Sequence, residues 1–232
     1  MKAYMIMDFN NPVSVAYSKM SIESFKPVED LIEIIPIQCI TPKDFKWVDK
    51  VDQYGIGPAL DASIAGKELY FWPTLIYMRN KHREWTEGEK ACFSSHFKLW
   101  YQNDDRWIIM EHDAYLLDED KFRKDFARMN NYDIWMPGIA VEFYSMSRKF
   151  LNHLYNKIDE GWHTIPYGPM AFLEKLWKDS QFSNLVPKNG DNRLLSDGSN
   201  SCITQAYSDS LGLTLEHTHK PSRESQTNFF YF

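Results

Sequence analysis

The sequence has 232 residues and a mass of 27.4 kDa, enough for one ordinary domain that buries about 70% of the unfolded chain's surface. Its 26 Lys and Arg against 32 Asp and Glu give a net charge of −6. This excludes a general basic field that would hold nucleic acid or an anionic membrane. A hydrophobic content of 44% with 25% charged residues excludes wholesale disorder.

The cysteines indicate a reducing compartment. Cys39, Cys92 and Cys202 lie far apart, form no CxxC pair and are odd in number, unlike a disulfide framework. The first residues hold too short an apolar run for a signal-peptide core, and nowhere do eighteen uncharged apolar residues follow one another. We therefore expect a cytoplasmic protein without a membrane span.

The first forty residues are typical of the start of an α/β domain. Residues 3–7 form a short apolar run that predicts a buried strand, and the Asn and Pro residues after it predict a loop leading to a helix that begins near Val13. Residues 31–40 predict a second strand, which Pro36 restricts to the edge or end of a sheet. The spacing favours a βαβ unit. Residues 41–73 are rich in Gly and Pro with weak periodicity, so we expect mostly loop and at most one short helix.

The middle of the chain has the clearest local signals. Thr86 and Glu89 form a capping box, and an apolar stripe beyond it predicts a helix over 87–102. The strongly apolar residues 106–110 predict a central strand that stops at acidic residues. The elements expected after it are a strand at 133–136, helices at 149–158 and 170–178, a loop at 187–200 and an apolar tail at 227–232 that packs on the domain.

Two acids follow the predicted central strand. In open α/β sheets ligands bind at the carboxyl ends of strands, where the loops diverge. On an extended backbone Glu111 and Asp113 would point the same way and share one divalent ion, while His112 faces elsewhere. Hard oxygen ligands select Mg²⁺ or Mn²⁺, and such an ion would bind substrate phosphates. The alternative is that both acids are simply solvated.

Residues 86–117 resemble the signature region of glycosyltransferase family 25. That region has a Glu-x-x-Cys-Phe-x-Ser-His-x-x-x-Trp helix, then a hydrophobic strand and Glu-Asp-Asp. His112 replaces the middle Asp of the acidic motif, and residues 143–154 resemble a strand and helix that follow in the family. The residues that fall on the helix pattern are Glu89, Cys92, Phe93, Ser95, His96, Leu99 and Trp100.

The resemblance implies an α/β, GT-A type fold: a Rossmann-like mixed sheet flanked by helices. We expect a single domain over 1–232, with a nucleotide-sugar-binding half at 1–117 and an acceptor half at 118–232. The implied activity is transfer of a sugar, with inversion, from a nucleotide-sugar donor, commonly a UDP-sugar, to a hydroxyl of a glycan or lipopolysaccharide-like acceptor. Mn²⁺ or Mg²⁺ would be held on the acidic motif. The family's arginines in the first strand-to-helix loop are missing here.

The residues assigned to this chemistry fall into three groups. The predicted metal ligands are Glu111, Asp113, His217 and His219. The predicted donor-binding residues are Ser95, His96, Glu111 and Lys220, with His96 orienting the acidic loop or contacting the donor and having no acid–base role. An inverting transfer also needs a general base, for which the candidates are Asp191, Asp197 and Glu142. For the late residues 217–220 the alternative is a solvated tail.

Three other functions remain open at this stage. The same chemistry on a modified phage DNA base is one, although the charge of −6 argues against nucleic acid as a partner. A sugar-nucleotide-binding protein without turnover is a second, motivated by His112 in the acidic motif. The third is a metal hydrolase that uses Glu111, Asp113 and the late histidines with a metal-bound water.

Overall fold

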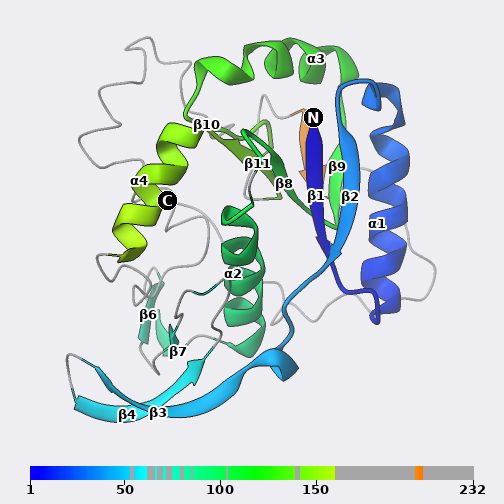
Figure 1. The fold of residues 1–232 in the computed structure, drawn as a ribbon. Helices are drawn as coiled ribbons and strands as arrows, with labels where there is room; N and C mark the ends of the chain where they lie inside the picture. The colour runs from blue at the N-terminus through cyan, green and yellow to red at the C-terminus, as the bar shows by residue number, and fades with distance from the viewer. Residues whose placement is uncertain are drawn as a thin grey trace.

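The computed structural model shows a mixed sheet flanked by helices (Figure 1). None of the helices in the part of the chain it describes is both long and apolar enough to cross a membrane. The residues described are 1–52, 55–61, 66, 70–71, 75–78, 81–84, 86–102, 104–138, 142–159 and 202–205.

The main sheet has five strands in the order β10-β11-β8-β1-β2. β1 is parallel to both of its neighbours, whereas β11 is antiparallel to β8 and β10 is antiparallel to β11. The mixed α/β prediction is therefore confirmed. The strands are β1 (Lys2–Met7), β2 (Glu33–Gln38), β8 (Ile108–Glu111), β10 (Ile134–Trp135) and β11 (Phe143–Met146).

The predicted βαβ unit is confirmed. α1 (Pro12–Ser24) connects β1 to the parallel strand β2, and the Asn11 side chain accepts a hydrogen bond from the Val13 N–H at its start. Asn is a preferred N-cap because its side-chain oxygen accepts from a first-turn N–H, and Pro suits the first helical position because an N–H there would have no intrahelical acceptor. Pro36 lies in β2, which is the last strand of the sheet order as predicted, because a residue without an N–H cannot pair on both sides.

Each face of the sheet carries its own apolar core. One core combines Ile6, Ile109 and Tyr144 with residues of α2 (Glu87–Trp100) and α4 (Arg148–Asp159). The other combines the alternate strand residues, such as Met110, with residues near the end of α1 and residues of α3 (Glu119–Arg128). Neighbouring strand residues belong to opposite cores because side chains alternate across a strand.

Between the first two strands and α2 the sequence prediction is wrong. Residues 41–73, expected to be mostly loop, contain a short 3-10 helix (Pro42–Asp44), the antiparallel pair β3 (Lys46–Asp52) and β4 (Gly55–Asp61), and β5 (Tyr70–Phe71). β6 (Leu75–Met78) and β7 (Lys81–Glu84) form a further pair. The hydrogen bonds of these ladders link residues distant in sequence, so weak local periodicity does not reveal them.

The sequence prediction also omits α3. Asp118 caps its N-terminus by accepting a hydrogen bond from the Lys121 N–H at 2.9 Å, and Phe122 is fully buried. The signal is present in the sequence as an Asp cap followed by Phe122, Phe126 and Met129 at helical spacing. The helix predicted at 170–178, the loop at 187–200 and the tail at 227–232 lie outside the described residues.

Candidate active site

The carboxyl ends of three parallel strands bring the candidate site together. Ile6 of β1 is in register with Glu111 of β8 on one side and with Ile37 of β2 on the other. Glu111 is the last residue of β8. The prediction of extended backbone from Glu111 through Asp113 is wrong: His112 and Asp113 form a turn that leads into β9 (Ala114–Leu116). The acidic motif therefore lies where ligands bind in open α/β sheets.

β11 holds the acidic motif from the other side. The Glu111 N–H donates to the Glu142 carbonyl at 2.8 Å, which extends the β8–β11 ladder by one step. Glu142, a candidate base, thus lies directly beside Glu111, and it is buried at 1% exposure. Three acidic residues, Glu111, Asp113 and Glu142, therefore lie at this edge of the sheet.

Gly138 makes room for the Glu142 carboxylate. A Cβ placed on Gly138 would lie 2.4 Å from Glu142 Oε1, closer than real contacts allow. We expect Gly138→Ala to lower the free energy of unfolding by about 1–3 kcal/mol, because the buried carboxylate must move. Gly88→Ala is the matched control, since its Cβ meets nothing nearer than 4.0 Å and a helical Ala is favoured over Gly. Urea unfolding compares them; equal midpoints for Gly138→Ala and the wild type would contradict this packing.

His96 joins α2 to the acidic motif. Its ring is fully buried, with Nε2 3.1 Å from Glu111 Oε1 and Nδ1 3.0 Å from the Tyr144 hydroxyl. The Trp100 indole N–H donates to the same hydroxyl at 2.9 Å. An ionised carboxylate only accepts hydrogen bonds, so Nε2 carries the hydrogen that Glu111 receives. The sequence predicts that His96 orients the acidic loop or contacts the donor; the structure shows its contact with Glu111, and donor contact stays a prediction. The sequence pattern does not indicate that Tyr144 completes the chain of bonds.

The pKa values of Glu111 and Asp113 shift in opposite directions. Burial works to raise the pKa of Glu111, but the His96 hydrogen bond and the positive charges of His96 and His112 outweigh it, so the pKa is lowered. Burial raises the pKa of Asp113 to about 6; His112 opposes this and the negative charge of Glu111 adds to it. Asp113 is 5% exposed, and its Oδ1 has no hydrogen-bond partner among the described residues. Paired acids with diverging pKa values are typical of functional sites.

Ser95 is hydrogen-bonded on both sides within the protein. Its hydroxyl donates to the Ala91 carbonyl and accepts from the Ile40 N–H, both at 2.8 Å. It is 2% exposed, so it ties the chain after β2 to α2. Donor binding by Ser95 stays a prediction. The other predicted site residues, Asp191, Asp197, His217, His219 and Lys220, lie outside the described residues.

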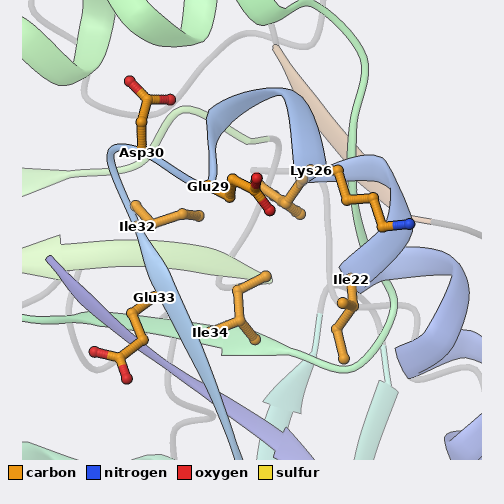
Figure 2. A pocket seen from close by; sticks show the side chains of 8 residues that line it. Ile22, Lys26, Glu29, Asp30, Ile32, Glu33 and Ile34 are labelled. Atoms are coloured by element: carbon orange, nitrogen blue, oxygen red, sulfur yellow. The ribbon is translucent and has the colours of Figure 1, made fainter.

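A surface hollow of about 650 Å³ lies away from this site (Figure 2). It is lined by residues from the end of α1 to the start of β2, including Lys26, Glu29 and Glu33. The amino end of β2 is at the opposite end of the sheet from the acidic motif. Its volume is within the range of small-ligand sites, but the acids with shifted pKa values lie elsewhere, so we assign the chemistry to the carboxyl edge.

A comparison with known protein families gives a match to this chain. The model of glycosyltransferase family 25 (LPS biosynthesis protein) matches residues 33–160, more than half of the chain. The chain belongs to glycosyltransferase family 25. The match spans β2, α2, β8, the acidic motif and α4. Neither the curated proteins nor the solved structures contain a significant match to this chain.

Family membership supports glycosyltransferase activity with a sugar donor and an acceptor as substrates. Within the family signature, the structure shows what two of the shared residues do. His96 is hydrogen-bonded to Glu111, the first acid of the motif. The Trp100 N–H donates to the Tyr144 hydroxyl, which is also the partner of His96 Nδ1. His96 and Trp100 therefore support the acidic motif from within the core.

Proposed function

We propose that this member of family 25 has a GT-A type site and transfers a sugar, with inversion, from a nucleotide-sugar, a UDP-sugar in the first instance, to a hydroxyl of a saccharide acceptor. The observation that carries the proposal is the buried Asp113 carboxylate beside Glu111 at the carboxyl edge of the parallel strands. Acidic residues at this edge would lie close to the diphosphate of a nucleotide bound in the crevice. Two acids repel a diphosphate unless a cation lies between them.

The acids fit a divalent metal. Asp113 Oδ1 is buried without a hydrogen-bond partner among the described residues, and carboxylate oxygens suit Mn²⁺ and Mg²⁺. Glu111 and Asp113 would hold the ion, with His217 and His219 as further proposed ligands. A bound divalent ion supplies Lewis-acid neutralisation of the charge on the leaving nucleoside diphosphate.

The chain's own residues then position the reaction. His96 fixes the Glu111 carboxylate through Nε2, and the Tyr144 hydroxyl prevents the imidazole from rotating. Glu142, held beside Glu111 by a main-chain bond, is the one candidate base within the described residues, with Asp191 and Asp197 as the other candidates. The base accepts the proton of the acceptor hydroxyl as its oxygen attacks the anomeric carbon.

A thermal-shift panel of nucleotide-sugars with and without Mn²⁺ tests the proposal. A donor at 100 times its Kd is expected to stabilise the fold by about 2.7 kcal/mol, which is roughly 5–10 °C in Tm for a chain of this size. We expect a UDP-sugar to give this shift with Mn²⁺ and to lose most of it with EDTA. The free sugar without its nucleotide is the control.

Product release separates the remaining alternatives. Transferase activity predicts UDP release that a saccharide acceptor accelerates. UDP release with water alone at the same rate would indicate a hydrolase, and binding without release would indicate a sugar-nucleotide-binding protein. If no nucleotide-sugar shifts the Tm with any divalent metal, the proposed function is wrong.

A further inference from the structure

Three potential metal ligands of different chemistry meet at the end of β8. Cys92 and His96 lie one turn apart on α2, and Glu111 faces both. Cys92 Sγ is 4.0 Å and His96 Nε2 is 3.1 Å from Glu111 Oε1, and one ligand atom from each of the three residues lies within 4.8 Å of the others. With zinc–ligand bonds of about 2.0–2.3 Å, the ligands of a tetrahedral site are separated by roughly 3–4 Å. Small side-chain movements are enough to reach that geometry.

The histidine of this group already has the support that a metal ligand needs. Metal-binding imidazoles usually bond through the second ring nitrogen to a partner that fixes the ring. Here Nδ1 lies 3.0 Å from the Tyr144 hydroxyl, and the ring packs against Tyr144 with centroids 5.7 Å apart. When Nε2 binds a metal, the ring hydrogen moves to Nδ1. The Tyr144 hydroxyl hydrogen then turns away from Nδ1, and the Tyr144 oxygen accepts from both Nδ1–H and the Trp100 N–H, which its two lone pairs allow.

The local charges also favour a cation. The carboxylates of Glu111 and Asp113 place negative charge beside the Cys92 thiol, whose sulfur lies 4.0 Å from Glu111 Oε1. A divalent ion with the Cys92 thiolate and the Glu111 carboxylate gives a group with no net charge, which is the form that a buried site tolerates. Asp113 Oδ1, buried and without a hydrogen-bond partner in the described part of the chain, is a second sign of a region that attracts cations.

We propose that Cys92, His96 and Glu111 form a zinc site that overlaps the oxygen-ligand site of Glu111 and Asp113 at Glu111. A set of one sulfur, one nitrogen and one oxygen selects Zn²⁺ over Mg²⁺ and Mn²⁺. Binding breaks the S–H bond of Cys92, releases the proton to solvent and forms a Zn–S bond. Because Glu111 belongs to both sites, zinc withdraws it from the donor-site metal and inhibits transfer; this consequence alone rests on the proposed function.

Metal binding to the metal-free full chain tests the site without any activity measurement. A chromophoric chelator in competition with the protein measures the Zn²⁺ affinity. Co²⁺ replaces zinc as a spectroscopic probe, because a thiolate ligand gives a sulfur-to-cobalt charge-transfer band. We expect one Zn²⁺ per chain in the wild type, and at least about 100-fold weaker binding with no charge-transfer band in Cys92→Ser.

Cys39→Ser is the matched control, because Cys39 is a half-buried thiol outside the group. It should keep both the affinity and the band. Cys92→Ala, which carries no hydroxyl, should repeat the loss seen in Cys92→Ser, and circular dichroism of each variant reports whether it folds. The proposal is overturned if zinc does not bind one to one, if Cys92→Ser binds as the wild type does, or if the band disappears in Cys39→Ser. Zinc binding in a chain that fails every donor test would leave the site intact and refute only the proposed function.

Discussion

Replacing Asp113 with Asn is expected to slow sugar transfer by about 100-fold or more, and at the same time to stabilise the fold above pH 6. The loss of activity follows from removing one of two carboxylates at the proposed metal site, since 100-fold corresponds to about 3 kcal/mol of transition-state stabilisation. The gain in stability follows from removing a charge that is buried without a hydrogen-bond partner at Oδ1. Functional sites often contain residues that lower the stability of the fold but are needed for activity.

The sign of the pH dependence follows from the raised pKa. Burial raises the pKa of Asp113 from 3.8 to about 6 in the folded state. Below about pH 4 the residue is protonated in both states and costs nothing. Between about pH 4 and 6 the unfolded chain loses its proton first, so the stability of the wild type falls; above pH 6 the full cost, about 2–3 kcal/mol, remains. In Asp113→Asn this cost is absent.

Urea unfolding at pH 4 and pH 8, with EDTA present, measures the difference. Asp113→Asn should match the wild type within about 1 kcal/mol at pH 4 and exceed it at pH 8. Asp105→Asn is the control, because Asp105 is an exposed acid in the turn after α2 and its replacement should change neither stability nor activity. An Asp113→Asn variant that is less stable than the wild type at pH 8, or that retains full activity, would contradict the assignment.

Replacing His96 with Phe is expected to have the second large effect. Phe keeps a ring of similar size against Tyr144 but removes the hydrogen bonds to Glu111 and to the Tyr144 hydroxyl. The partly buried Glu111 carboxylate loses a donor, and the buried Tyr144 hydroxyl keeps its bond from Trp100 but loses its imidazole partner. These losses should lower the free energy of unfolding by about 2–4 kcal/mol at pH 7. Transfer should fall as well, because Glu111 is no longer held in place.

The cost of His96→Phe should depend on pH. Burial works against ionisation of Glu111, but the His96 bond and charge lower its pKa in the folded state. A lowered pKa contributes stability that is present above the unfolded value of 4.5 and is lost as the pH falls through the folded value. Urea unfolding of His96→Phe should therefore show its largest deficit at pH 7 and a smaller one below pH 4. His96→Gln retains an amide donor and should recover part of the loss; a deficit that is identical for Phe and Gln at every pH would show that only packing matters.

Local signals in the sequence predict much of the framework of the site. The Thr86–Glu89 capping box and the apolar stripe beyond it predict α2 to within two residues, and the Thr86 hydroxyl does accept from the Glu89 N–H at 3.2 Å. A capping box depends on residues three apart, so the sequence alone contains it. The end of β8 at Glu111 is predicted for the same kind of reason: an apolar run stops at an acid.

Contacts between distant segments could not be predicted in this way. The His96–Glu111 bond depends on how deeply α2 packs against β8, and the Glu111–Glu142 main-chain bond depends on the register of β8 and β11. The sequence predicts a pair of acids on extended backbone, but the turn at Asp113 replaces that geometry with a set that includes Cys92. The spacing of apolar residues shows which side of one helix or strand is buried, whereas tertiary packing decides which helices and strands contact one another.

The main-chain bond between Glu111 and Glu142 also bears on how the chain is divided. β8 belongs to the proposed nucleotide-sugar-binding half, 1–117, whereas its neighbour β11 belongs to the proposed acceptor half, 118–232, and the two strands are adjacent in one continuous sheet. A fragment ending at residue 117 would expose the backbone N–H and C=O groups of β8 along that whole side, an edge that invites self-association. We therefore expect that neither of the two proposed halves folds as a separate unit.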